Sequence, residues 1–142
     1  MDVYRYFVYA HLFLGVLLAG QALYWLTMLV ALRQRFEPAE TARLLQVVRS
    51  ARWPHVLVPY RLRLPLPGVM ALTLLALILS GLEIVHLRGG VPEGVGWGVK
   101  WALVLAVTVV LAMLAIRPRP TVIRLGFCLV LATIVASAVI IR

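Results

Sequence analysis

The chain has 142 residues, of which 63% are hydrophobic, and its mean hydropathy is +1.00. A composition this apolar lies far outside the range of soluble domains, so it predicts an integral membrane protein with the lipid bilayer as its surroundings. The formal net charge of +9 would indicate nucleic-acid binding in a soluble chain. In a membrane protein it is explained by basic loops at the membrane surface, and we expect no nucleic-acid partner.

Four apolar segments are long enough to cross about 30 Å of hydrocarbon, which takes about 20 helical residues. Because four spans use most of the chain, we predict an all-α fold, a four-transmembrane-helix bundle in a single integral membrane domain, 1–142. The first segment runs on without a small-residue cleavage site, so we expect it to remain as a helix and not to be a signal peptide. The predicted spans are about 6–32, 66–87, 97–116 and 121–141.

The first predicted span contains the earliest polar groups within the membrane. His11 follows an aromatic cluster of the kind that lies among lipid headgroups, so it is expected just inside the outer leaflet. Gln21 lies deeper, and its amide should face the bundle because lipid would leave it without hydrogen bonds. Between them come small residues that favour close helix packing, namely Gly15, Ala19 and Gly20.

The connection over 33–65 holds half of the basic residues of the chain. The positive-inside rule places this connection in the cytoplasm and therefore both termini outside, as expected for a multi-pass protein of a bacterial-type inner (plasma) membrane. The seven arginines of this connection are Arg33, Arg35, Arg43, Arg49, Arg52, Arg61 and Arg63.

Two structures are predicted within this cytoplasmic connection. Glu37 and Pro38 form a helix start signal, so a short helix should run to about Arg52. This helix is either amphipathic, lying on the membrane surface with its arginines among anionic headgroups, or a solvated extension of the first span. Four prolines between Trp53 and Pro67 then predict a stiff, extended Pro-rich strap.

The remaining spans differ in what they contribute. The second ends in a stretch, Ser80 to His86, that places Glu83 and His86 three positions apart and so about one turn apart on a helix. The third opens at Lys100. The fourth contains Gly126 and several alanines and is predicted to be a packing helix, with its single cysteine, Cys128, as a small buried hydrophobe.

Four ionisable side chains are expected in one layer near the outer surface: His11, Glu83, His86 and Lys100. An ionisable residue within a span is a functional hypothesis by default. Neutral imidazoles bind haem iron and copper, and a nearby carboxylate can fix the tautomer of a ligating histidine. His11 and His86 are therefore the predicted metal ligands, Glu83 would orient one of them, and Lys100 would hold a haem propionate.

A simpler interpretation of the same layer has no ligand. Lys100 would extend outward to the headgroups, His86 would be hydrated, and Glu83 would pair with Lys100 or Arg88. A single Glu-x-x-His is weak support for a metal site, because bundle sites that use this motif need it twice.

Several short sequences resemble the copper-resistance D-like group of small four-helix membrane proteins, which is similar in layout to the membrane-integral protoporphyrinogen oxidases. They are Ala10 to Gly15, Leu79 to Leu82 and Gly96 to Trp101, and the likeness covers roughly residues 6–117. The resemblance implies that His11 matches the first-span histidine and Lys100 the lysine that opens the third span. The oxidases have a Trp and later a Pro-Arg pair downstream of this histidine, whereas here Leu18 stands in place of the Trp and no Pro-Arg pair follows in the first span. The resemblance therefore implies a role with b-type haem or copper rather than the oxidase activity.

Three functions are consistent with these patterns. The first is a redox or metal-binding module that holds b-type haem, or less favourably copper, and serves electron transfer or haem and copper handling. The second is a non-catalytic accessory subunit of a larger respiratory or photosynthetic membrane complex, which would have other membrane protein subunits or further copies of itself as partners. A transporter fits less well, because few polar residues lie deep in the spans. Motifs of hydrolases, kinases and thiol-redox enzymes are not found in the sequence.

Overall fold

The computed structural model describes residues 3–51, 64–91 and 94–140, and these residues form five helices and no strand. Four of the helices are long and apolar enough to span a membrane. The all-helical class and the four predicted spans are therefore confirmed. The helices are α1 (Val3–Arg35), α2 (Pro38–Ser50), α3 (Leu66–Leu87), α4 (Val95–Ile116) and α5 (Pro120–Ile140).

Prolines and glycines set most of the helix ends. Pro38 begins α2 directly after an extended Glu37, because proline is well suited to the first turn, where its missing N–H is not needed. Pro120 is likewise the first residue of α5. At the end of α3, Gly89 adopts a φ of +88°, a left-handed conformation that glycine tolerates and that stops the helix.

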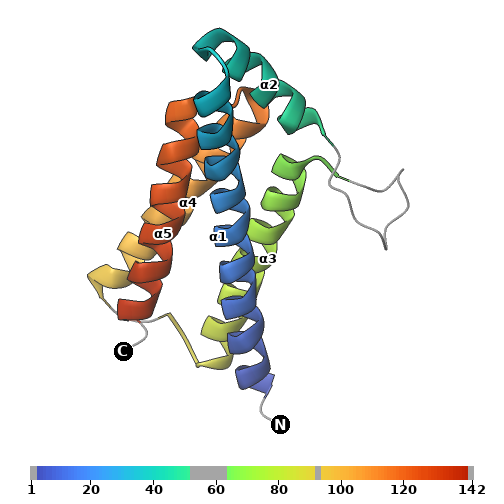
Figure 1. Ribbon diagram of the computed structural model, residues 1–142. Helices are drawn as coiled ribbons and strands as arrows, with labels where there is room; N and C mark the ends of the chain where they lie inside the picture. The colour runs from blue at the N-terminus through green and yellow to red at the C-terminus, as the bar shows by residue number, and fades with distance from the viewer. Residues whose placement is uncertain (1–2, 52–63, 92–93, 141–142) are drawn as a thin grey trace.

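The four spans form an antiparallel bundle in which α1 packs mainly against α3 and α5, and α4 packs mainly against α5 (Figure 1). The start of α1 and the end of α5 lie at the same end of the bundle, which we call the terminal end. The short helix α2 lies at the opposite end. Four spans return the chain to the side on which it began, as the sequence predicts.

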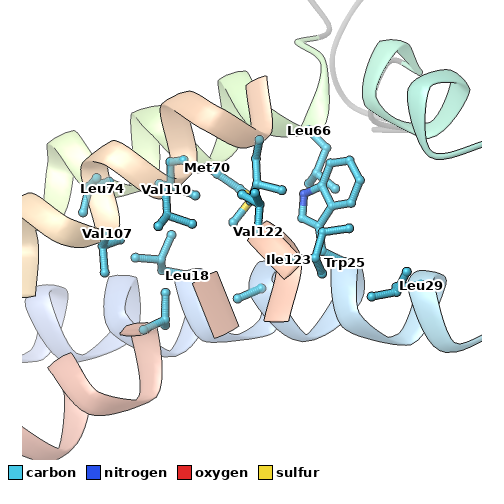
Figure 2. Packing of buried hydrophobic residues seen from close by; sticks show 14 of the residues in the cluster. Leu18, Trp25, Leu29, Leu66, Met70, Leu74, Val107, Val110, Val122 and Ile123 are labelled. Atoms are coloured by element: carbon cyan, nitrogen blue, oxygen red, sulfur yellow. The ribbon is translucent and has the colours of Figure 1, made fainter. Parts of the chain in front are cut away.

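The interior of the bundle is filled by large apolar side chains, and Trp25 of α1 is among the most completely buried (Figure 2). The outward faces of the spans are also apolar, with many exposed leucines and valines. A bundle whose interior and outer surface are both apolar is suited to lipid, because hydrocarbon offers no hydrogen bonds to polar side chains. The most buried side chains are Trp25, Leu29, Leu45, Leu66, Met70, Ile123 and Thr41.

Close helix packing occurs at a different glycine from those expected in α1. A Cβ atom on Gly126 would lie 3.0 Å from Val110 Cγ1, so this glycine allows α5 to approach α4. Gly15 and Gly20 have no such neighbour within 4 Å.

The prediction for Cys128 is wrong, because its side chain is exposed. Two positions along a helix correspond to about 200° of rotation, so Cys128 lies opposite the buried face that Gly126 marks.

The helix α2 confirms the element expected after Pro38, although it ends at Ser50. Leu45 is buried beneath it. Arg49 Nη1 donates hydrogen bonds to the carbonyl oxygens of Ala115 at 2.7 Å and Ile116 at 2.8 Å, at the C-terminal end of α4, where a cation is favourable. Its position on the membrane surface stays a prediction. Most of the predicted Pro-rich strap lies outside the described residues.

Candidate functional site

A cavity of about 260 Å³ lies among the four spans toward the terminal end of the bundle. Its walls are mostly aliphatic, and its inner end is lined by Leu18, Leu74, Val107 and Val130. Its polar lining is gathered near the terminal end and comes from three different helices. These polar residues are His11 of α1, Lys100 of α4, and Thr133 and Ser137 of α5.

The imidazole of His11 is held by the helix opposite. Its Nδ1 lies 2.8 Å from Ser80 Oγ on α3, and Ser80 Oγ also lies 3.0 Å from the carbonyl oxygen of Leu77. A serine hydroxyl has one proton, and the carbonyl can only accept, so both bonds form when Ser80 donates to Leu77 and His11 Nδ1 donates to Ser80. This tautomer leaves Nε2 of His11 with a lone pair and no partner among the described residues.

A missing side chain on α3 makes room for the imidazole. The neighbour of Ser80 in sequence is Gly81, and a Cβ atom there would lie 3.1 Å from Cε1 of His11. The ring therefore rests directly against the backbone of α3. Ser80 fixes the ring through a hydrogen bond and Gly81 provides the space, so the Ser-Gly pair acts as a seat for His11.

Lys100 supplies a positive charge to the same cavity. Its Nζ lies 5.5 Å from the centroid of the Trp97 ring, which is within the range of a cation–π interaction. Trp97 in turn packs edge to face with Trp101, with centroids 6.0 Å apart. No Asp or Glu is found among the described residues that line the cavity. The ammonium group therefore faces a pocket with no carboxylate to neutralise it.

The structure brings together two of the four predicted site residues and leaves the other two elsewhere. Neither Glu83 nor His86 lines the cavity. At about 100° per residue they point about 160° and 140° away from Gly81, whose face of α3 meets His11. His86 is exposed. The described residues contain no group of three or more His, Cys, Asp or Glu placed to hold a metal ion. Joint ligation by His11 and His86 stays a prediction that this arrangement does not support.

Two residues that contact His11 were not predicted as part of a site. Ser80 orients the imidazole of His11, which is the role that the sequence led us to expect of Glu83. Gly81 leaves the space against α3 that the ring occupies. The only signal for them is a small, polar pair near the end of a leucine-rich span. Their relation to His11 depends on how α1 and α3 are rotated, which uniformly apolar helices do not reveal.

No protein-family model, curated protein or solved structure matches the chain. The resemblance to the copper-resistance D-like group therefore stays a prediction. The cavity itself has an apolar inner end and a terminal end that carries a cation, an imidazole and hydroxyl groups.

The cavity is also open toward the outside of the bundle. Leu12 and Val16 of α1 line it and are 56% and 71% exposed, and Ile134 of α5 lines it and is 39% exposed. In a membrane, these side chains face lipid acyl chains. The cavity volume of about 260 Å³ has room for roughly 9 water-sized groups, at about 30 Å³ for each. This is enough for a molecule with one hydrocarbon chain and a small polar end.

Proposed function

We propose that the protein binds an amphipathic molecule in this cavity, with its polar end at His11 and Lys100 and its hydrocarbon part among the aliphatic walls. The observation that carries the proposal is the separation of the lining, in which charge and hydrogen-bonding groups occupy one end and Leu18, Leu74 and Val107 the other. Ligand sites are mostly apolar with a few polar groups that fix orientation, which is the arrangement here.

An acidic polar end fits the groups that are present. Lys100 provides a full positive charge that no carboxylate in the described lining neutralises. The Ser137 hydroxyl can donate a hydrogen bond, and Nε2 of His11 can accept one from a hydroxyl group. A carboxylate or phosphate with a neighbouring hydroxyl would satisfy all three. The exposed lining residues Leu12 and Val16 indicate that such a molecule enters sideways from the bilayer.

The experiment is a binding measurement on the detergent-purified protein. A spin-labelled long-chain fatty acid should bind the wild type with an immobilised spectrum. Lys100→Met should weaken the affinity by about tenfold or more, because it removes the charged partner that the described lining provides, and Lys100→Arg should retain most of it. Arg88→Met is the matched control, since Arg88 is exposed and outside the cavity. Equal affinity in all variants would contradict the proposal.

The second candidate ligand is b-type haem, and a specific observation favours it. The tautomer set by Ser80 leaves Nε2 of His11 free beside an apolar cavity, as in histidines that hold haem iron while donating from their other nitrogen. His11 would be the iron ligand and Lys100 would hold a propionate. Haem would supply one-electron redox chemistry when bound, which would make the protein an electron-transfer or haem-handling module.

Haem and a lipid-like acid are distinguished by one absorption spectrum. Protein titrated with haem should shift the Soret band away from its position in free haem, in both the oxidised and the reduced state, and His11→Ala should abolish that difference if iron is bound through this residue. If the spectrum of haem does not change when it is mixed with the protein, fatty-acid binding remains as the proposed function. Copper is less favoured, because His11 is a single donor in the cavity and the described residues offer no group of three ligands.

The orientation and assembly of the protein are also proposals. Arginine-rich segments at the α2 end support a cytoplasmic position for α2, with both termini outside and the chain in a bacterial-type inner membrane. A role as an accessory subunit would place other membrane proteins, or a second copy, against the exposed apolar faces of the spans. Size measurement of the purified protein together with a search for co-purifying subunits tests that role.

A further inference from the structure

A second polar site lies deeper in the bundle, between α1 and α3. Gln21 is only 5% exposed, and its Nε2 donates a hydrogen bond to Thr73 Oγ1 at 3.1 Å. The orientation expected from the sequence, with Gln21 facing the bundle, is thus confirmed. Trp25, one turn further along the same face of α1, is 1% exposed. The two side chains therefore form a buried polar layer near the middle of the membrane.

This layer contains one acceptor and one donor that no described residue satisfies. Gln21 Oε1 and Trp25 Nε1 are both buried and have no hydrogen-bonding partner within the described part of the chain. Thr73 cannot supply the missing donor, because its hydroxyl proton goes to the carbonyl oxygen of Val69 at 2.9 Å. Buried polar atoms are almost always hydrogen-bonded, and lipid hydrocarbon offers no substitute.

A small cavity adjoins Trp25. Its volume is about 10 Å³, close to the least that holds one water molecule. Trp25 lines it together with Met70 and Ile123, which Figure 2 shows in the same packed region, whereas Gln21 and Thr73 do not line it. The cavity therefore provides space on the indole side of the layer, and the polar site itself is defined by the two unsatisfied atoms. Val107 and Val130 line both this cavity and the larger one, so the two cavities are neighbours along the bundle.

We propose that this layer binds a single water molecule, which accepts a hydrogen bond from Trp25 Nε1 and donates one to Gln21 Oε1. A water is the smallest molecule that both donates and accepts, and the complementary pair of unsatisfied atoms requires both. Thr73 Oγ1 retains a lone pair that can accept the second proton. The water would join α1 to α3 beneath the ligand cavity, independently of what that cavity binds.

The test is an NMR measurement on the full chain in detergent micelles, with ¹⁵N-labelled tryptophan. The chain has four tryptophans, and the Trp25 indole signal is assigned as the one lost in Trp25→Phe. In the wild type, the Trp25 Nε1 proton should show a cross-peak to a long-lived water. Gln21→Met should abolish that cross-peak, whereas Gln34→Met, an exposed position on the same helix, should leave it unchanged.

Three results would overturn the proposal. The first is a hydrogen-bonded Trp25 indole without a water cross-peak, which would mean a direct bond to Gln21. The second is an indole proton with the chemical shift of a group that makes no hydrogen bond. The third is a water cross-peak that persists in Gln21→Met. The first two are read from the wild type alone, so the proposal is tested even if the Gln21 variant does not fold.

Discussion

His11 and Ser80 are 69 positions apart in the sequence, and Nδ1 of the imidazole lies 2.8 Å from the serine hydroxyl oxygen. This contact ties α1 to α3 at the level of the ligand cavity. Because Nδ1 bonds to Ser80, Nε2 is the ring nitrogen that is left for a ligand. The seat made by Ser80 and Gly81 can be tested separately from the ligand itself.

Ser80→Ala should weaken haem binding by about 10-fold to 100-fold, because outer partners that fix a metal-ligating histidine typically contribute that much, and it should also weaken fatty-acid binding. The substitution removes the Ser80 hydroxyl, which is one of the two groups on α3 that bond to the ring, and leaves only the carbonyl oxygen of Leu77. Affinity for the fatty acid or haem, whichever binds, is the measurement. Thr108→Val is the control, since the Thr108 hydroxyl bonds only to the carbonyl oxygen of Val104 in its own helix and is exposed. Equal losses of ligand affinity in Ser80→Ala and Thr108→Val would contradict the role of Ser80 in holding the His11 ring.

Gly81→Ala should displace the His11 ring without changing any hydrogen-bonding group. The new Cβ atom would meet His11 Cε1 at 3.1 Å, closer than ordinary van der Waals contact. Ligand affinity should therefore fall while the helix content measured by circular dichroism stays the same. Gly20→Ala is the control, because nothing lies within 4 Å of that position. Unchanged affinity in Gly81→Ala would show that the ring does not need to rest against α3.

The sequence was sufficient to predict the spans and the layer in which His11 and Lys100 lie, because span length is a strong signal in a membrane protein and consecutive spans alternate in direction. It was not sufficient to predict which face of each helix points inward. A soluble helix reveals its buried face by a polar stripe on the other side, and helices that are apolar all round do not. For this reason the sequence points to the carboxylate of Glu83 and gives no signal for Ser80.

Gln21 and Cys128 differ in how well their burial can be predicted from the sequence. The amide of Gln21 has a strong preference for the interior, and it is buried as expected. The thiol of Cys128 is only weakly polar and has little preference, so its exposure on α5 could not be deduced from composition. Similarly, Gly126 and Gly20 look equivalent in sequence, but only Gly126 meets a neighbouring helix closely.

Gly126→Val should destabilise the bundle by about 1–3 kcal/mol, the usual effect of forcing extra atoms into a well-packed interface. Even a Cβ atom would lie 3.0 Å from Val110 Cγ1, so α4 and α5 would have to separate. Thermal unfolding in detergent measures the change, and Gly20→Val is the control at a position with free space. If both variants unfold at the wild-type temperature, the close packing of α4 and α5 does not contribute to stability.

Arg49→Ala should loosen α2 from the bundle. The substitution removes the two hydrogen bonds that Arg49 donates to the carbonyl oxygens of Ala115 and Ile116. Since the guanidinium is partly exposed, we expect a loss of roughly 1 kcal/mol, together with faster proteolysis after α2. Arg43→Ala removes an exposed arginine from the same helix and should have neither effect. Equal proteolysis rates in the two variants would contradict a role for Arg49 as the link between α2 and α4.

The proposed orientation predicts which end of the bundle a membrane-impermeant thiol reagent reaches in intact cells. With Cys128 replaced by alanine, Val91→Cys carries the only thiol at the terminal end, and Ser50→Cys carries it at the end of α2; both positions are exposed. The reagent should label Val91→Cys in intact cells and Ser50→Cys only after the membrane is opened, because the arginines around α2 favour the cytoplasm. The reverse pattern would place α2 outside. It would also mean that the cavity at His11 faces the inner leaflet.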